Sequence, residues 1–542
     1  MPQHTTDTDK KKLFGGVAVL MPATLFTKLV GLFYKIPLIA IVGVEGMAYF
    51  LAAYHIYSLL FVLSATGLPT ALSLQVARAV AVGERRGVRR IFGVALALFL
   101  SLGLAGTLLL LYAAPSLAER LAMESAAASI VAIAPALLLS AFIGAVKGFF
   151  QGHQKMLPTA LSEVLEAAGK LGFGLFFALL AKGRGLPTPQ VAAYAIFGIT
   201  AGLAVAALFL LVRLLVFFLT ERGERPTEGE LPKRRTVLGA LLKIAVPMTV
   251  SASVMSLVSL IDTALISNRL QSAGFAPSAA HALYSAYGNL AVPLYNLVPS
   301  LLAPVTLSLM PMLGAALSKG ERAQGREALA ASLRLCLLIA IPASLGLAVF
   351  AEPILSMIYR GAGEAVSVAA PALSMLAPAV LPAVLLSLTG AALQAAGHTL
   401  LPVVAMGAGA AVKLTLEILL LPVSGIYIYA APISTMACNL TVLVIEAVAL
   451  SRLMGGRLVR AGDLFRVLAA ALVGIGGAAA LYFLLVVRFG RAVWVLPVAL
   501  LCAVLLFLPP ALLLGAVRRE ELAALPMGER LCLFLTKRKL LK

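Results

Sequence analysis

The sequence predicts an all-α integral membrane protein with about fourteen transmembrane helices, and composition, apolar segment length and charge placement support this fold class. Of the 542 residues, 61% are hydrophobic and only 12% are charged, and the mean hydropathy is +1.02. A soluble globular protein carries about 25% charged residues. A soluble fold of this length could not bury so much apolar surface, so a lipid bilayer is the expected solvent.

Apolar stretches follow one another along the chain, and each can cross a membrane because about 20 helical residues span a hydrocarbon core of roughly 30 Å. The first six predicted spans are residues 14–42, 46–77, 91–113, 126–148, 156–181 and 190–219. The remaining spans are residues 238–266, 280–316, 328–350, 366–395, 399–421, 425–451, 464–487 and 492–516. The first is too long for a signal-peptide core and contains lysines, so we expect the mature protein to keep it.

Lysine and arginine gather in alternate connections, and short loops rich in these residues stay on the cytoplasmic side of a membrane. The basic connections are Lys10–Lys12, Arg85–Arg90, Lys155, Arg222–Arg235, Lys319–Arg326, Arg452–Arg466 and the tail from Arg518 to Lys542. Both termini are therefore predicted to be cytoplasmic, which requires an even number of spans. This placement accounts for the net charge of +20 without nucleic-acid binding.

The longest charged segment inside the chain separates two groups of spans and predicts a division into lobes. The predicted regions are a cytoplasmic N-terminus (1–13), an N-lobe (14–219), a cytoplasmic linker (220–237), a C-lobe (238–452), a final helix pair (453–516) and a basic cytoplasmic tail (517–542). The two lobes hold six spans each. We therefore expect two related six-helix halves followed by a C-terminal helix pair.

An internal repeat at a spacing of about 240 residues supports this division. Ile133-Ala-Pro-Ala-Leu-Leu138 recurs as Leu376-Ala-Pro-Ala-Val-Leu381, in the fourth helix of each half. Gln151, His153 and Lys170 recur in the same order as Gln394, His398 and Lys413. Because six helices form one unit, the second copy enters the membrane from the same side. The repeats are therefore parallel, and we expect a cavity between the halves.

Ionisable residues deep in the predicted spans are the candidates for lining that cavity, since each costs about 2.5–3.5 kcal/mol at a helix centre unless it faces protein or water. Lys28 and Lys35 lie seven residues apart on one helix face and have no acidic neighbour in their own span. They are the candidate anchors for an anion. Four other cations lie near predicted cytoplasmic helix ends, where a long side chain can reach the lipid headgroups: Lys147, Arg213, Lys243 and Arg334. Glu446 also lies near such an end, but its side chain is shorter.

Two further charged groups have two interpretations each. Glu163, Glu166 and Lys170 share one face of the fifth span, and the eleventh span carries Lys413 and Glu417. These residues either contact the transported molecule or form internal ion pairs, Glu166 with Lys170 and Lys413 with Glu417. Asp262, near the outer end of the seventh span, either binds a cation or caps that helix end.

Several motifs resemble a known family. They are Val44-Glu-Gly46, Gly67-Leu-Pro-Thr-Ala-Leu-Ser73, Gly148-Phe-Phe-Gln-Gly-His153, Ile261-Asp-Thr-Ala-Leu-Ile-Ser267 and Leu270-Gln-Ser-Ala-Gly-Phe275. Together they resemble the stage V sporulation protein B group of the multidrug/oligosaccharidyl-lipid/polysaccharide exporter superfamily, which also includes the MurJ lipid II flippases. The resemblance covers nearly the whole chain. It implies alternating access by two six-helix lobes around a central cationic cavity, with an apolar groove for lipid tails on the last two helices.

The resemblance also implies roles for two lysines. Thr27-Lys-Leu-Val-Gly31 is similar to a MurJ pattern in which an arginine occupies the position of Lys28. Lys35 lies where MurJ has a charged pair. Both positions are therefore expected to bind the phosphates of a lipid-linked substrate.

These observations predict a transporter, not an enzyme, that flips an undecaprenyl-(pyro)phosphate-linked cell-wall or polysaccharide precursor across the bacterial cytoplasmic membrane. The candidate residues are Lys28, Lys35, Lys170 and Lys413 for the phosphates, Gln151, His55, Asn289 and Asn296 for the sugar, and Asp262, Glu163 and Glu166 for ion coupling. The alternatives are a cation-coupled multidrug exporter, which would use those carboxylates, and a polytopic membrane glycosyltransferase.

The expected partners are the lipid-linked oligosaccharide and membrane lipids, and the expected state is a monomer. No cofactor or metal is expected, because Cys336, Cys438, Cys502 and Cys532 lack zinc-site spacing. The membrane potential, Na⁺ or H⁺ remain open as energy sources. A role in the vegetative wall and a role in the spore cortex also remain open.

Overall fold

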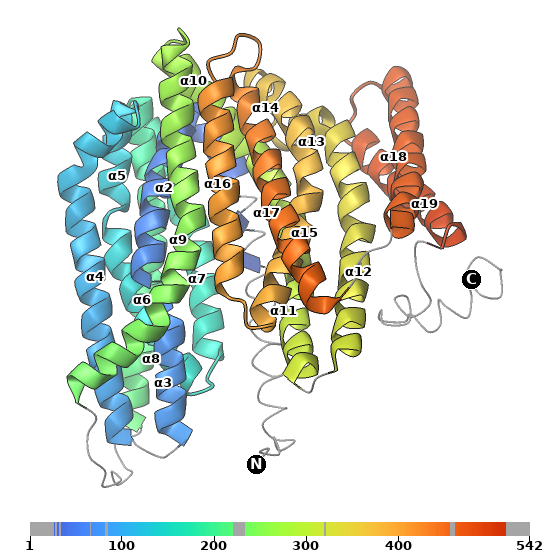
Figure 1. Ribbon diagram of the computed structural model, residues 1–542. Coiled ribbons are helices and arrows are strands. Elements are labelled where there is room, and N and C mark those ends of the chain that lie inside the picture. Colours follow the sequence, from blue (N-terminus) through green and yellow to red (C-terminus); the bar gives the residue numbers. More distant parts are fainter. Residues whose placement is uncertain are drawn as a thin grey trace. The chain divides into compact units, whose positions relative to one another are not determined.

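A computed structural model of the chain describes residues 26–27, 30–31, 34–65, 67–81, 85–220, 233–318, 321–455 and 461–515. In this part of the chain every regular element is a helix, and no strand occurs (Figure 1). The all-α fold class predicted from the sequence is confirmed. Most of the first predicted span lies outside the described residues, but its last residues, 34–42, are helical.

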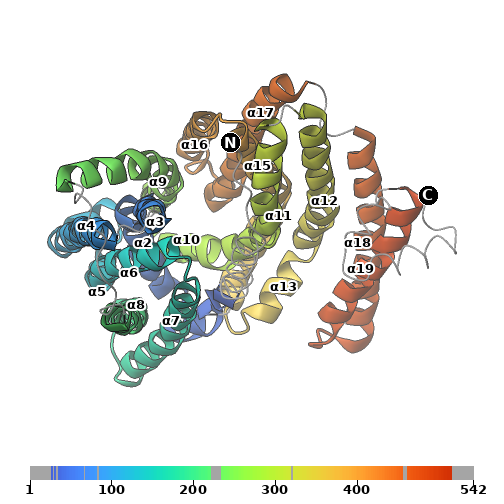
Figure 2. The ribbon, with the colours of Figure 1, turned by 90° about the horizontal axis from the view of Figure 1, so that it is seen from below.

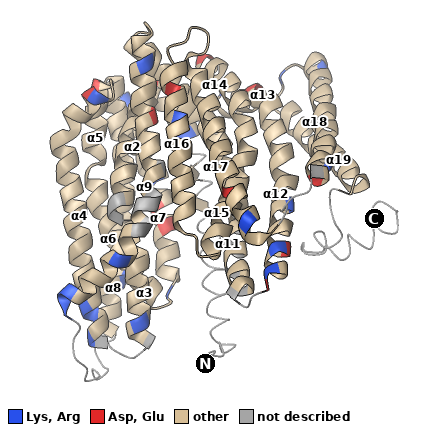
Figure 3. Ribbon diagram, viewed as in Figure 1, with Lys and Arg blue, Asp and Glu red and all other residues tan. Residues whose placement is uncertain are grey.

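Eleven helices in the described part are long and apolar enough to cross a membrane. They match predicted spans two to six and nine to fourteen. The segments at 238–266 and 280–316 are also helical but are not among the eleven, so the total of about fourteen spans stays a prediction. In Figure 3, lysine and arginine gather where the ends of α3, α4 and α8 meet, and again near the start of α12.

The chain divides into two compact units, and the first comprises residues up to Gln271 together with Phe275–Ser285. Its helices are α2 (Val44–Ala65), α3 (Gly67–Ala81), α4 (Arg85–Arg120), η1 (Glu124–Ala126), α5 (Ala127–Ile133), α6 (Pro135–Gly152), α7 (Leu157–Gly183), α8 (Thr188–Thr220), α9 (Arg234–Ser272) and α10 (Pro277–Ser285). Asn268 and Gln271 attach α9 to this unit by donating to the carbonyls of Arg120 and Ala122. The linker predicted at 220–237 lies mostly outside the described residues, and the lobe boundary there stays a prediction.

The second unit comprises Ser272–Gly274 and the chain from Ala286 onward. Its helices are the π-helix η3 (Ala286–Ala291), α11 (Val292–Ser318), α12 (Arg322–Val349), α13 (Ala351–Ile358), α14 (Gly363–Leu376), η4 (Ala377–Ala379), α15 (Val380–Ala395), α16 (Leu400–Leu420), η5 (Tyr427–Tyr429), α17 (Ala430–Met454), α18 (Ala461–Phe489) and α19 (Val495–Leu513). The last two helices pack beside α12 (Figure 2). Leu337, Ile341, Val467 and Phe507 form part of that buried contact.

The repeated Ala-Pro-Ala motif breaks the fourth helix of each half at the same place. Pro135 separates α5 from α6, and Pro378 lies in the 3-10 turn η4 between α14 and α15. Proline lacks a backbone N–H, so it removes a helical hydrogen bond that lipid cannot replace. Side chains from neighbouring helices donate to carbonyls at both breaks.

These donors occupy matching positions in the two halves. Thr107 donates to the Ala134 carbonyl at 3.0 Å, and Ser344 donates to the Ala377 carbonyl at 2.8 Å. The sixth helix of each half also supplies a donor, although to carbonyls that are not equivalent in the repeat: Thr200 bonds the Ala132 carbonyl at 3.0 Å, and Asn439 bonds the Ala379 carbonyl at 3.3 Å. The bond from the third helix to the fourth is therefore repeated together with the sequence motif.

A glycine seam brings α7 and α8 into close contact, and these helices lie side by side in Figures 1 and 2. A Cβ atom placed on Gly169 would lie 2.7 Å from the Cα atom of Gly202. A Cβ atom on Gly198 would overlap the backbone of Gly174. Small residues at membrane helix interfaces let backbones approach closely and pack tightly. The seam therefore fixes how α7 presents its charged face.

We expect Gly169→Ala to destabilise the protein by about 1–3 kcal/mol, because the added methyl group forces α7 and α8 apart. Gly172→Ala on the same helix is the matched control, since a Cβ atom there meets nothing within 4 Å. The measurement is thermal unfolding of the purified full chain in detergent. Equal unfolding temperatures for the two variants would contradict the close-packed seam.

Candidate functional site

The first predicted span places Lys35 beside α7 and α8. Tyr34, its neighbour, is buried and donates to the Ala195 carbonyl of α8 at 3.4 Å. The Tyr34 ring also occupies the space that a side chain at Gly174 would need. Lys182 of α7 donates to the Ala40 carbonyl at 3.2 Å. Lys35 is half-buried on a packed helix, whereas Lys28 lies outside the described residues.

Helix α7 presents Glu163, Glu166 and Lys170 as half-buried side chains. Glu163 pairs with Lys147 of α6, with 3.6 Å between its Oε1 atom and the Lys147 Nζ atom. The alternative pairing considered from the sequence, Glu166 with Lys170, is absent although both residues are described. Lys170 forms no ion pair in the described part of the chain. It is therefore a cation in the membrane-spanning region without a fixed counter-ion among those residues.

An aromatic row on α2 lies near the Glu166 carboxylate. Tyr54, Tyr57 and Phe61 follow one another along the helix, with ring centroids 6.1 Å and then 5.8 Å apart. The Tyr57 hydroxyl bonds the Ser140 hydroxyl at 2.7 Å and lies within electrostatic reach of Glu166. Reasoning from charges missed this row. Its signal was the spacing of aromatics at three and four residues in the second span.

His55 belongs to a hydroxyl cluster that joins three helices. Its Nδ1 atom lies 2.7 Å from the Thr263 hydroxyl of α9 and 3.2 Å from the Tyr284 hydroxyl of α10. Thr263 and Tyr284 are themselves 2.8 Å apart. Asp262 is half-buried beside Thr263 in the chain. The structure therefore gives His55 a positioning role in holding α2, α9 and α10 together.

The other predicted polar residues lie on α6, η3 and α11. Gln151 is half-buried in the last turn of α6. Asn289 is buried in the π-helix, and its carbonyl accepts a hydrogen bond from the Tyr359 hydroxyl at 3.3 Å. Pro293, four residues later, has no N–H to donate to that carbonyl. Asn296 is exposed on α11. Each of the three side chains therefore lies on a different element, and Gln151 belongs to the first unit whereas Asn289 and Asn296 belong to the second.

Lys413 and Glu417 form the buried ion pair that was one of the two interpretations. The Lys413 Nζ atom lies 3.7 Å from Glu417 Oε1, and the two side chains are 9% and 0% exposed. Ser434 of α17 donates to the same oxygen at 2.9 Å. A buried pair with added hydrogen bonds fixes α16 against α17. Its carboxylate already neutralises Lys413.

Glu446 of α17 is a buried carboxylate that sequence reasoning placed near a cytoplasmic end. It is 2% exposed, and its Oε2 atom accepts a hydrogen bond from Thr389 of α15 at 2.5 Å. Gly390 leaves the space that this carboxylate fills, since a Cβ atom there would lie 3.2 Å from Oε1. No cation pairs with Glu446 in the described part of the chain. It joins Asp262, Glu163 and Glu166 as a candidate for ion coupling.

A family model described as polysaccharide biosynthesis protein matches residues 13–316 of the chain. The chain belongs to this family. A second model, MatE, matches residues 247–419. The chain is therefore a member of the multidrug/oligosaccharidyl-lipid/polysaccharide exporter superfamily, as the sequence motifs predicted.

Three Bacillus subtilis (strain 168) proteins are similar to this family member. The uncharacterized membrane protein YabM is 31% identical over 420 residues, covering 76% of this chain and 76% of the relative. Stage V sporulation protein B is 25% identical over 358 residues, covering 66% of this chain and 68% of the relative. Lipid II flippase MurJ is 26% identical over 426 residues, covering 75% of this chain and 77% of the relative.

Solved structures of the exporter superfamily share the fold. An inward-facing multidrug resistance MATE family transporter superimposes with a TM-score of 0.68 at 16% identity, covering 79% of this chain and 94% of the other. Lipid II flippase MurJ in an inward closed conformation superimposes with a TM-score of 0.67 at 15% identity. The match covers 91% of this chain and 98% of the other. The predicted all-α membrane transporter fold with two lobes is confirmed.

Removing Lys413 alone should destabilise the protein by about 3–5 kcal/mol, because Glu417 is left as an unpaired buried charge. Lys413→Met combined with Glu417→Leu should recover most of that loss. A double-mutant cycle by thermal unfolding in detergent measures the coupling, with Lys182→Met as an exposed-lysine control. If the double variant is no more stable than Lys413→Met, the two side chains are not coupled as the structure indicates.

Proposed function

We propose that the protein flips a polyprenyl-(pyro)phosphate-linked sugar, a lipid II-like precursor, across the bacterial cytoplasmic membrane by alternating access. The observation that carries this proposal is the pair of half-buried lysines in the membrane-spanning part of the first unit, Lys35 and Lys170. A cation at this depth is costly unless it faces protein, water or an anionic ligand. The named relatives include a lipid II flippase, which supports the same substrate class.

Lysine suits phosphate recognition because its ammonium group is a compact point charge. Lys35 and Lys28 supply the first contacts in this proposal, and Lys170 supplies the next. Lys413 contributes last, because Glu417 already neutralises it at 3.7 Å. The phosphates cross in a solvated path while the polyprenyl tail stays in lipid.

The aromatic row of α2 gives the sugar a surface. Apolar faces of sugar rings pack on aromatic side chains, and Tyr54 is 36% exposed at the end of the row. Polar contacts then come from Gln151, Asn289 or Asn296. Glu166, within electrostatic reach of Tyr57, orients hydroxyl groups at this face.

A cation-coupled drug exporter is the second candidate, and the MatE match at residues 247–419 favours it. Such a transporter uses carboxylates to bind its coupling ion. Asp262, Glu166 and Glu446 would serve, whereas Glu163 already pairs with Lys147. Cationic drugs are the less suitable cargo beside Lys35 and Lys170, because like charges repel.

The lysine anchors are tested by Lys28→Ala and Lys35→Ala, singly and together. Transport of a lipid-linked phosphate into liposomes, and complementation of a flippase-depleted strain, should fall about tenfold or more when a charge-assisted phosphate contact is lost. Lys35→Arg should restore most activity. Lys233→Ala removes an exposed lysine just before α9 and should leave transport unchanged. Undiminished function in a well-expressed double variant would remove the anchors from the proposal.

Precursor accumulation and drug susceptibility separate the two candidates. In a depleted strain we expect lipid-linked cell-wall precursors to accumulate while susceptibility to cationic drugs stays unchanged. Asp262→Asn and Glu446→Gln should then slow precursor transport by altering ion coupling, and neither should change drug resistance. Increased drug accumulation without precursor accumulation would favour the exporter.

A further inference from the structure

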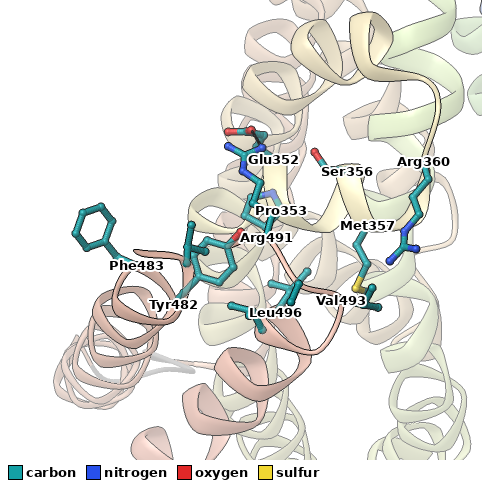
Figure 4. A pocket seen from close by; sticks show the side chains of 13 residues that line it. Glu352, Pro353, Ser356, Met357, Arg360, Tyr482, Phe483, Arg491, Val493 and Leu496 are labelled. Carbon is teal, nitrogen blue, oxygen red and sulfur yellow. Dashed lines mark hydrogen bonds and ion pairs between the residues drawn. The ribbon is translucent and has the colours of Figure 1, made fainter. Parts of the chain in front are cut away.

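A pocket of about 550 Å³ lies within the second unit, at the end of the structure where α13 meets the connection between α18 and α19. Helix α13 and the residues after it provide one wall, including Glu352, Met357 and Arg360. The end of α18 and the start of α19 provide the other, including Tyr482, Arg491 and Leu496. Figure 4 shows these side chains around the cavity.

The pocket combines an excess of positive charge with an apolar floor. Arg491 pairs with Glu352 at 3.0 Å, and both side chains are largely exposed. Arg360 forms no ion pair in the described part of the chain, and its guanidinium ends beside Met357 and Val493 in Figure 4. The lining therefore contains two guanidinium groups and one carboxylate. The pocket suits an anion more than a cation, because Arg491 already occupies the carboxylate.

The floor of the pocket is packed against a buried cluster. Tyr482 packs edge-on against Phe350, with ring centroids 5.8 Å apart. Phe350, Ile475 and Leu496 belong to one buried cluster against which Met357 and Tyr482 pack. A packed floor holds the arginine-bearing segments in place and reduces the entropy lost when a ligand binds.

The aromatic residues around the pocket indicate a membrane–water interface. Trp494, the single tryptophan of the chain, packs edge-on against Phe489, with ring centroids 5.1 Å apart. Phe483 and Val487, on the neighbouring turns of α18, are 67% and 70% exposed. Tryptophan and arginine beside exposed apolar side chains are typical of the headgroup level of a bilayer. The positive-inside pattern predicts this end of α12 and α18 to lie on the external side.

We propose that this pocket binds the headgroup phosphate of an anionic glycerophospholipid of the outer leaflet. Arg360 and Arg491 contact the phosphate, since a guanidinium offers paired N–H groups that match phosphate oxygens. The acyl chains lie along the exposed apolar face of α18. A free phosphate ion would make no contact with that apolar face. The proposed function assigns the phosphates of the transported substrate to other residues, Lys28, Lys35 and Lys170.

The test is lipid binding to the purified full chain, measured by native mass spectrometry with phosphatidylglycerol and phosphatidylcholine. Wild type should prefer phosphatidylglycerol. Arg360→Ala combined with Arg491→Ala should weaken phosphatidylglycerol binding about tenfold, the loss expected from charge-assisted hydrogen bonds. Arg488→Ala is the matched control, because this arginine lies at the same end of α18 but does not line the pocket. An equal effect of both changes would overturn the proposal.

Two further measurements test whether a loss of binding reflects misfolding and whether another phosphate compound occupies the pocket. Glu352→Gln removes the competing carboxylate and should tighten phosphatidylglycerol binding about two- to fivefold by releasing Arg491. Weaker binding by this variant would contradict the proposal. Inorganic phosphate and undecaprenyl phosphate are added as competitors, and neither should displace phosphatidylglycerol at equal concentration. Displacement by either one would reassign the pocket to a free anion or to the transported lipid.

Discussion

One constraint governs this structure: every backbone polar group inside a bilayer must find a hydrogen-bond partner within the protein. Lipid offers no hydrogen bonds, so each proline inside a span creates a demand that neighbouring side chains must meet. Tyr359 meets it at the Asn289 carbonyl, because Pro293, four residues later, has no N–H. Thr107 and Ser344 add hydrogen bonds to the Ala134 and Ala377 carbonyls beside the two Ala-Pro-Ala breaks. In each half this bond ties the third helix to the fourth at an equivalent place in the repeat.

Ionisable side chains inside the bilayer also need partners, and the two units differ in which of these side chains have one. In the second unit Lys413 has Glu417 and Ser434, and Glu446 has Thr389. In the first unit Glu163 has Lys147, whereas Lys170 forms no ion pair in the described part of the chain. The first unit therefore keeps positive charge available at membrane depth. This difference makes an anionic cargo compatible with a chain whose fold also serves drug exporters.

The sequence was a good guide wherever the deciding interaction lay within one helix or one repeated motif. Helix positions followed from apolar length, and the spacing of one turn between Lys413 and Glu417 made their ion pair one of two interpretations, which the structure bears out. The partner of Glu163 did not follow, because Lys147 lies on another helix and only packing brings α6 and α7 together. His55 was named as a candidate for the sugar, and its contacts with Thr263 and Tyr284, which join helices about 200 residues apart in sequence, were not foreseen. Contacts of this range depend on the tertiary fold.

The lysines repeated in the two halves have different surroundings. Lys170 and Lys413 correspond across the repeat, and by the same offset Glu417 corresponds to Gly174. At Gly174 the missing side chain makes room for Tyr34, which anchors the first span beside α7. At Glu417 the carboxylate instead neutralises its lysine and bonds Ser434. This position therefore differs between the halves in two ways: at Gly174 it leaves room for the first span, and at Glu417 it supplies the counter-ion of its lysine.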